Sequence, residues 1–309
     1  MKKFFSADNF KSASNIFATV GTFDGCHLGH RSLFNDLKKF AYENNAKTLI
    51  FTFWPHPRSI LSPDFDFKLL NNMEEKIQLF DQCNIDNVII EKFSRDFSRI
   101  SPLNFIRDVL INKLKISGLV IGYNHHFGRN REGSYTELKD YAETYGFKLY
   151  QSSPYKNKGV SISSTKIRNY ISQGELKLAN SFLGYNYFFT GKVIKGEGLG
   201  VKIGYPTANI LVADSMKLIP NTGVYAVKSI IDSKEYLGMM NIGYRPTFKG
   251  KQKSIEVNLF NLNQDLYDRD LKINVLYKIR DEIKFDNIEL LKNQISNDKK
   301  NILSFLKNK

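Results

Sequence analysis

The first half of the chain alternates short apolar runs with segments whose apolar residues recur at helical spacing. Residues 16–20, 48–53 and 118–122 have the length and the β-branched or aromatic content of buried strands. Between such runs, segments such as 31–41 and 135–145 repeat apolar residues every three or four positions, which is typical of amphipathic helices. This alternation predicts an α/β domain built on a doubly wound parallel sheet.

The pattern changes near Tyr185, where strand-like segments follow one another with glycine and asparagine turns and no helical spacing between them. Helical spacing returns only from Phe285 onward. We therefore expect a small antiparallel β-barrel with a terminal helix. The expected boundary near Gly184 divides the chain into residues 1–184 and 185–309. The predicted strands are residues 187–193, 223–231, 236–242, 254–260 and 271–277.

Composition supports two folded domains, because 309 residues are too many for one typical core. Lys and Arg number 45 against 31 Asp and Glu, but the basic residues form no long block. Such a dispersed charge favours small anionic nucleotides over nucleic acid as partners. Cys26 and Cys83 lack metal or redox spacing; one disulfide between them is conceivable, but we expect two free thiols in a reducing cytoplasm. The polar residues that follow Phe5 exclude a signal peptide, and no apolar run approaches a membrane span.

Residues 21–30, Gly-Thr-Phe-Asp-Gly-Cys-His-Leu-Gly-His, join a predicted strand to a predicted helix. A turn of this kind directs backbone amides and the positive helix end at an anion, and glycine lets a phosphate approach closely. His27 and His30 could donate to phosphate oxygens. The His-X-Gly-His pattern resembles the nucleotidylyltransferases, which use it to hold the α-phosphate of ATP. The resemblance extends the expected ATP site to Gly21, Phe23, Asp24, Gly25 and Gly29.

Three other segments of the first half complete this expected site, because ligands of doubly wound sheets bind beyond the carboxyl ends of the strands. Pro55 and Pro57 follow one predicted strand and would form a rigid wall beside a flat ring, although a plain loop accounts for them equally well. Asn124 lies in a glycine-flanked loop after another strand. The hydroxyls of Ser164 and Thr165 begin a helix that carries Arg168, and they could either cap it or seat a phosphate.

The second half carries its own candidate phosphate site. A loop with Gly196, Gly198 and Gly200 is followed by the oxygen-bearing side chains of Thr207 and Asn209, which suit Mg²⁺. Glu256 lies inside a predicted strand, where a carboxylate is costly to bury unless it is used or paired. A solvent-facing glutamate remains an equal alternative.

Taken in order, these motifs resemble the prokaryotic bifunctional riboflavin kinase/FAD synthetase family over essentially the full chain. Residues 21–30, 53–57 and 163–168 look like its FMN adenylyltransferase motifs, and residues 204–209 and 241–248 with Glu256 look like its flavokinase motifs. Residues 279–285 resemble the segment that leads into the final helix of the family, near the flavin of the kinase. Asn258 stands where histidine is frequent, which leaves its role open.

The resemblance implies two ATP-dependent reactions that give FMN from riboflavin and then FAD from FMN. Glu256 would be the base of the kinase, with Mg²⁺ held by Thr207 and Asn209 and with Arg280 near the flavin. The catalytic residues of FMN adenylylation would be His27, His30 and Arg168. Its flavin would face Pro55, Pro57 and Asn124.

Three rival functions share part of this pattern. Another adenylyl transferase, of pantetheine phosphate or nicotinate nucleotide, would explain His27 and His30 but not the second domain. A tRNA synthetase relative is disfavoured because no Lys-Met-Ser-Lys-Ser-like loop is present. A basic RNA-binding protein is the non-enzymatic rival. The family resemblance instead implies small-molecule partners, no nucleic acid, no membrane, and a cytoplasmic monomer or weak homo-oligomer.

Overall fold

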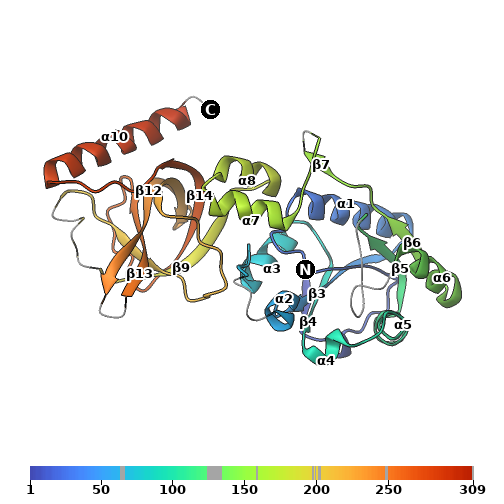
Figure 1. Ribbon diagram of the computed structural model, residues 1–309. Helices are drawn as coiled ribbons and strands as arrows, with labels where there is room; N and C mark the ends of the chain where they lie inside the picture. The colour runs from blue at the N-terminus through green and yellow to red at the C-terminus, as the bar shows by residue number, and fades with distance from the viewer. Residues whose placement is uncertain are drawn as a thin grey trace. The chain divides into compact units, whose positions relative to one another are not determined.

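The computed structural model describes residues 1–62, 67–123, 134–157, 159–196, 198, 200, 203–247 and 250–307. The chain forms two compact units, Met1–Ser164 and Thr165–Lys309 (Figure 1). This division lies earlier than the boundary expected at Gly184. Helix α8 (Leu176–Leu183) belongs to the second unit because Asn180 donates to backbone carbonyls of strand β14 (Asp270–Arg280). The division of two activities at Gly184 stays a prediction.

A six-stranded sheet in the order β1-β4-β3-β2-β5-β6 forms the first unit, and all neighbouring strands are parallel. The predicted doubly wound sheet is thus confirmed. The lysine-rich start of the chain, which briefly imitates a signal peptide, forms the edge strand β1, which the pattern did not predict. The strands are β1 (Lys2–Phe4), β2 (Ile16–Val20), β3 (Lys47–Trp54), β4 (Asn87–Lys92), β5 (Ile116–Ile121) and β6 (Lys148–Gln151).

Alternate residues of β2 serve opposite faces of the sheet. Ile16, Ala18 and Val20 share one apolar cluster with residues of η2 (Phe105–Lys113) and α6 (Tyr135–Tyr145). On the other face, Phe17 contacts Tyr150, whose ring stacks at 3.9 Å on Phe40 of α1 (Leu28–Glu43). The remaining helical segments of this unit are η1 (Ala7–Asn9), α2 (Pro57–Leu61), α3 (Met73–Asp81), α4 (Arg95–Ser98) and α5 (Pro102–Asn104).

The order of the strands reverses at β2, because β3 and β4 lie on one side of it and β5 and β6 on the other. Ligands of open α/β sheets bind at such a switch point, beyond the carboxyl ends of the strands. The turn after Val20 and the loops after Trp54 and Ile121 therefore meet at one edge.

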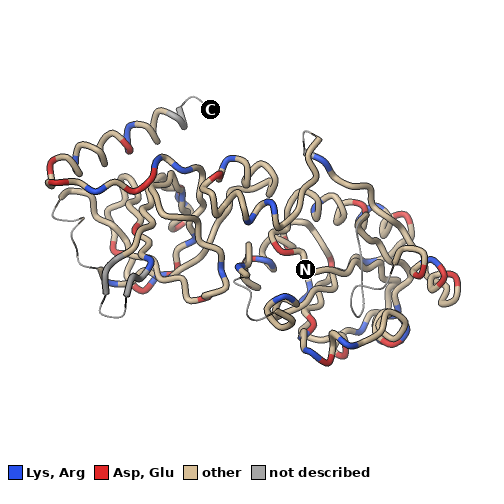
Figure 2. The backbone as a smooth tube through the Cα atoms, in the orientation of Figure 1, with Lys and Arg blue, Asp and Glu red and all other residues tan. Residues whose placement is uncertain are grey.

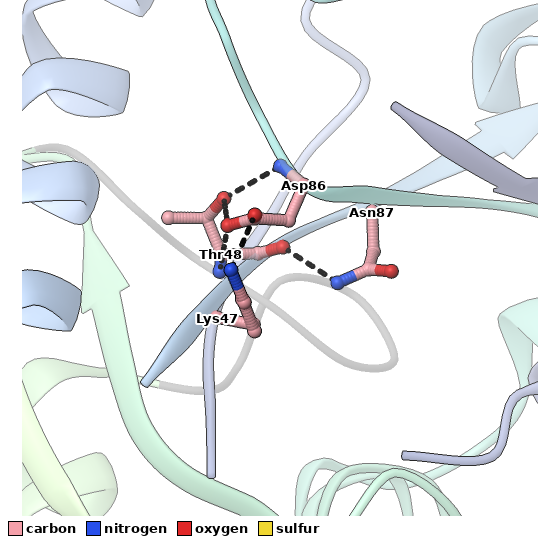
Figure 3. Close-up of polar contacts among 4 residues, drawn as sticks. All are labelled: Lys47, Thr48, Asp86 and Asn87. Carbon is pink, nitrogen blue, oxygen red and sulfur yellow. Dashed lines mark hydrogen bonds and ion pairs between the residues drawn. The ribbon is translucent and has the colours of Figure 1, made fainter. Parts of the chain in front are cut away.

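A polar cluster at the opposite edge holds the amino ends of β3 and β4 together (Figure 3). The Asp86 carboxylate accepts from the backbone amide of Thr48 at 2.9 Å and from its hydroxyl at 2.8 Å, and it pairs with Lys47 at 3.3 Å. Asn87 donates to the Thr48 carbonyl at 3.1 Å. Burial alone would raise the pKa of Asp86, but the bonds from Thr48 and Lys47 hold it below its usual range. The cluster fixes the register of the two strands.

The second unit is a closed barrel in the order β10-β13-β12-β11-β14-β9, with antiparallel pairing between all neighbours. The predicted antiparallel barrel is confirmed, while the short strand β10, which carries Asn209, was not predicted. Its strands are β9 (Phe188–Ile194), β10 (Ala208–Leu211), β11 (Gly223–Ile231), β12 (Lys234–Thr247), β13 (Gly250–Leu259) and β14. Three small elements follow β6 in the sequence before α8: β7 (Lys156–Asn157), β8 (Val160–Ser161) and α7 (Ser164–Ser172).

Helix α10 (Ile288–Lys307) is the predicted terminal helix and packs on the outer face of the barrel. Ile302 shares an apolar cluster with Val224 and Ala226 of β11. Asp298, which is buried, accepts from Arg280 at 2.9 and 3.0 Å, so an ion pair also joins α10 to β14.

Figure 2 shows lysine and arginine spread along both units and interspersed with acidic residues. Within the described part of the chain, no helix is both long and apolar enough to cross a membrane.

Candidate active sites

The turn between β2 and α1 has an unusual backbone that brings two histidines together. Phe23, Gly25 and Cys26 adopt positive φ angles of 49°, 86° and 37°. His27 caps α1 by accepting from the His30 amide at 3.3 Å, and the two imidazole rings stack at 3.6 Å. A side chain at position 29 would crowd the His27 ring at 3.2 Å, so Gly29 makes room for the stacked pair.

Asp24 anchors this turn to neighbouring segments through its carboxylate and its backbone carbonyl. Its carboxylate, with only 1% of the residue exposed, accepts from the amides of Leu70 and Asn71 at 3.1 and 3.2 Å. Its backbone carbonyl accepts from the Ser164 hydroxyl at 2.8 Å. The Asp24 carboxylate therefore binds the backbone of the loop before α3. Ser164, which was predicted to lie in this site, contacts the turn through its hydroxyl.

The remaining members of the predicted adenylylation site differ in how the structure places them. Thr165 and Arg168 lie on α7 in the second compact unit, and their role stays a prediction. Pro55 and Pro57 are half-buried directly after β3, where Pro57 opens α2. Asn124 falls outside the described residues.

His30 has an electrostatic environment that favours its neutral form. Burial, reinforced by the neighbouring His27 and Lys76, holds the pKa of His30 well below its usual range. Its buried Nδ1 atom has no hydrogen-bond partner among the described residues. At neutral pH this imidazole can therefore donate one hydrogen bond but carries no positive charge.

Sequence reasoning missed Lys76, a buried lysine of α3 that donates from Nζ to the Thr22 carbonyl at 3.0 Å. One signal was available: Lys76 precedes the buried residues Leu79 and Phe80 by three and four positions, so it falls on the apolar stripe of its helix. A lysine on such a stripe is rare and merits attention.

Cys26 and Cys83 are free and buried, and their side chains are hydrogen-bonded to each other. This bond and burial raise the pKa of Cys26 well above its usual range, whereas the same bond lowers the pKa of Cys83. The expectation of free thiols is confirmed.

The second candidate site lies where three strands of the barrel run side by side. Asn209 of β10 and Asn241 of β12 both pair with Glu256 of β13, so the three residues share one face. The Thr207 hydroxyl donates to the Glu256 carboxylate at 3.2 Å. This face also carries Met239, which packs in the cluster beneath α10, so the polar group opens on the outside of the barrel.

The glycines of the predicted phosphate loop approach this polar group closely. A side chain at Gly196 would collide with the amide of Asn209, and one at Gly200 would crowd the Thr207 hydroxyl at 3.1 Å. Gly198 has a positive φ of 70°, a conformation that other residues rarely adopt. The structure therefore places the glycine loop, Thr207 and Asn209 beside Glu256, which is 49 residues from Thr207 in the sequence.

Two further features of the barrel bear on the predictions. Asn258, whose role was open, donates from Nδ2 to the Pro206 carbonyl at 2.6 Å and so holds the bend before Thr207. Arg280 is paired with Asp298 and also donates to the Asp281 carbonyl at 3.0 Å. Its predicted contact with a flavin stays a prediction.

The two units match two family models. Residues 9–166 match the model described as FAD synthetase, and residues 183–306 match the one described as riboflavin kinase. The chain belongs to the bifunctional riboflavin kinase/FMN adenylyltransferase family. It is 39% identical over 293 residues to the family member of Buchnera aphidicola subsp. Schizaphis graminum, covering 93% of each chain. It is 36% identical over 303 residues to that of Bacillus subtilis (strain 168), covering 96% of this chain and 94% of the relative.

A solved structure agrees with this membership in fold. The structure described as "Crystal Structure of Macrolide-efflux Protein from Streptococcus pneumoniae" superposes with a TM-score of 0.89 at 29% identity, covering 96% of this chain and 97% of that one. The family thus accounts for both units at once, whereas the rival adenylyl transferases leave the barrel unexplained.

Proposed function

We propose that this chain phosphorylates riboflavin to FMN on the barrel and adenylylates FMN to FAD at the parallel sheet, using ATP in both steps. The observation that carries the proposal is the contact between Thr207 and Glu256 beside the glycine loop, in a different compact unit from the turn that stacks His27 on His30. Two separately built phosphate sites fit two successive phosphate reactions.

In the kinase reaction, Glu256 accepts the proton of the ribityl hydroxyl while that oxygen attacks the γ-phosphorus of ATP and ADP leaves. The loop with Gly196, Gly198 and Gly200 supplies backbone amides to the phosphates. The oxygens of Thr207 and Asn209 fit Mg²⁺, which prefers a few protein oxygens together with phosphates and water. When bound there, the ion supplies positive charge to the phosphates of ATP.

In the adenylylation reaction, an oxygen of the FMN phosphate attacks the α-phosphorus of ATP and pyrophosphate leaves. This nucleophile is already an anion, so the site needs donors and fixed geometry but no base. The donors are the amides of the turn together with His27, His30, Ser164, Thr165 and Arg168. The flavin lies against Pro55, Pro57 and Asn124.

The protein is proposed to work in the cytoplasm on small molecules, as a monomer or weak homo-oligomer and without nucleic acid. The interspersed charges along both units support this, because nucleic-acid sites concentrate basic residues on one face. A filter-binding assay with tRNA over a series of salt concentrations tests it, and strong salt-dependent retention would favour RNA binding instead.

The decisive experiment is to incubate the protein with riboflavin, ATP and Mg²⁺ and to separate the flavins over time. FMN should appear first and FAD second, and a chelator should stop the formation of FMN. A preparation that makes neither flavin would overturn the proposal.

A further inference from the structure

Lys76 places a buried ammonium at the edge of the sheet where the adenylylation site lies. Its side chain extends from α3, and only 1% of the residue is exposed. Nζ donates to the Thr22 carbonyl at 3.0 Å and lies 5.7 Å from the centre of the Trp54 ring. Thr22 follows β2 and Trp54 ends β3, so Lys76 links two of the segments that converge on the switch point.

This ammonium has no ion-pair partner among the described residues. The closest acidic influence is Asp24, but the carboxylate oxygens of Asp24 accept from the amides of Leu70 and Asn71. The Thr22 carbonyl takes one of the three N–H groups of Lys76. A buried charge that no counter-ion contacts is costly to the fold, and it is retained at functional sites where that charge is used.

The anionic substrates of the proposed reaction require a positive charge that His30 cannot provide. Burial, His27 and Lys76 keep the imidazole of His30 neutral. Lys76 is charged at neutral pH, although burial lowers its pKa to about 8 against the opposing influence of Asp24 and Cys26. Among the described residues of the first compact unit, Lys76 is thus a fully buried cation beside the turn, and the half-buried Arg31 donates from Nε to the Cys26 carbonyl at 3.2 Å.

We propose that Lys76 is a positioning residue for FMN adenylylation: it clamps the Thr22 carbonyl, so that the turn presents its amides, and its charge favours the triphosphate of ATP. This inference rests on the proposed function of the first unit. The groups that face Lys76 and titrate or carry charge are Asp24, Cys26 and His30.

The variant Lys76→Met tests the role of the charge. Methionine has a similar length and is apolar, so it fills the same buried space and removes the cost of the buried ammonium. FAD formation from supplied FMN should fall by on the order of 10²-fold, as on loss of one electrostatic contribution to a transition state. Riboflavin phosphorylation should stay within about twofold of wild type, because the second unit contains none of these residues. The matched control is Lys139→Met. It makes the same substitution at an exposed lysine of α6, a helix that contributes no residue to the proposed adenylylation site.

The pH profile separates this role from a purely structural one. In the wild type, kcat/KM of adenylylation should decline as pH rises through about 8, because Lys76 loses its proton in the free enzyme. The decline in kcat should come at higher pH, since bound phosphates favour the charged form. Lys76→Met should lack this decline and Lys139→Met should keep it. Lys76→Arg, which stays charged, should retain activity within about tenfold of wild type and also lack the decline.

Stability gives a readout that does not depend on activity. The folded protein releases the Lys76 proton near pH 8, whereas the unfolded chain holds it to about 10.4, so wild-type stability gains from rising pH in this window. Lys76→Met should therefore melt at or above the wild-type temperature at pH 7, and its advantage should shrink toward pH 10.

Several results would overturn the inference. FAD formation by Lys76→Met within threefold of wild type would remove the charge from the mechanism. A lowered melting temperature with both activities declining together would make Lys76 a structural residue only. An alkaline decline that persists in Lys76→Met would belong to another group and refute the titration. A wild-type protein that makes no FAD would instead overturn the proposed function, and this inference with it.

Discussion

The two proposed sites would both bind ATP, and they are built by different structural means. In the sheet unit the key polar groups are buried: Asp24, His27 and Lys76 are each at most 5% exposed. In the barrel unit, Thr207 and Glu256 are half-buried on the outside of a closed wall of strands. The difference follows the chemistry. An anionic nucleophile needs only fixed donors and positive charge, whereas a hydroxyl must also give up a proton to a carboxylate.

The comparison also shows how each fold brings distant residues together. A parallel sheet collects its loops at one edge, so the first site is made of turns and helix ends. An antiparallel barrel pairs residues directly across strands, so Asn209, Glu256 and Asn241 lie in one row. Chemically related sites therefore arise here from loops in one unit and from strand register in the other.

The largest expected effect is that of Glu256→Gln, which keeps the size of the side chain but cannot accept a proton. Riboflavin phosphorylation should fall by roughly 10²–10⁴-fold, the usual contribution of general base catalysis. FAD production from supplied FMN should be unchanged, because the first site uses no base. Both activities are measured on one preparation of confirmed fold, and kinase activity within threefold of wild type would remove Glu256 from the mechanism.

His30→Ala is the reciprocal change in the first site. FAD formation should fall by about 10²-fold or more, since a preorganised donor beside the reacting phosphate is lost. FMN formation should remain near the wild-type rate. Equal loss of both activities in a folded variant would show that the two sites are not independent.

Asn258→Ala should have a smaller effect, confined to the kinase. Loss of the bond to the Pro206 carbonyl frees the bend that positions Thr207, and one such hydrogen bond contributes about 0.5–1.5 kcal/mol. We expect riboflavin phosphorylation to fall by about tenfold and FAD synthesis to be unaffected. Asn258→His, the residue that the family resemblance leads us to expect here, serves as the conservative comparison. Equal rates for Asn258→Ala and wild type would make this hydrogen bond dispensable.

Two fragments sharpen the boundary between the units. A fragment of residues 185–309 should fold and make FMN, and one of residues 165–309 should do so with a higher melting temperature. The longer fragment keeps Asn180, which joins α8 to the carbonyls of Val275 and Leu276 and accepts from the Tyr187 amide. Three such bonds contribute about 1 kcal/mol each. Circular dichroism and flavin separation test both fragments, and identical melting temperatures would assign α8 no part in the barrel.

The smallest effect concerns stability alone. Asp86→Asn weakens the cluster at the amino ends of β3 and β4 and should lower the melting temperature of the first unit at pH 7 without altering either activity. The pKa of Asp86 is lower in the folded protein than in the unfolded chain. The charged carboxylate therefore stabilises the fold at pH values above its unfolded-state pKa, and this stabilisation is lost as the pH falls through its folded-state pKa. The difference between variant and wild type should therefore shrink in acid. A constant difference at every pH would assign the effect to packing.

Much of the fold could be predicted because its elements carry strong local patterns. The wholly buried β2 is a continuous apolar run, and α6 lies within the bounds that its spacing predicts. The failures have a common physical cause. Strand β1 and strand β10 are short and gain their stability from pairing with distant strands, which no local pattern records.

The candidate sites show the same division between features with a local sequence pattern, which were predictable, and contacts between distant residues, which were not. The turn with His27 and His30 and the glycine loop were predictable, because both carry glycines with special backbone freedom, whereas the stacking of the two imidazole rings was not predicted. The buried state of Lys76 was not predicted, because a lysine on an amphipathic helix is ordinarily exposed. The partner of Asn258 could not be predicted either, since it is a carbonyl far away in the sequence.

The short strand β10 has a consequence for the motions of the barrel. Its four residues close the ring of strands, because they join β9 on one side and β13 on the other. Asn209 belongs to this strand, so a local opening of β10 would break the ring and separate Asn209 from Glu256 in a single event. Backbone amides of β10 that bond to β9 or β13 can exchange their hydrogens only through such an opening. A nucleotide bound beside Asn209 must then slow that exchange, since ligand binding favours the closed barrel by mass action.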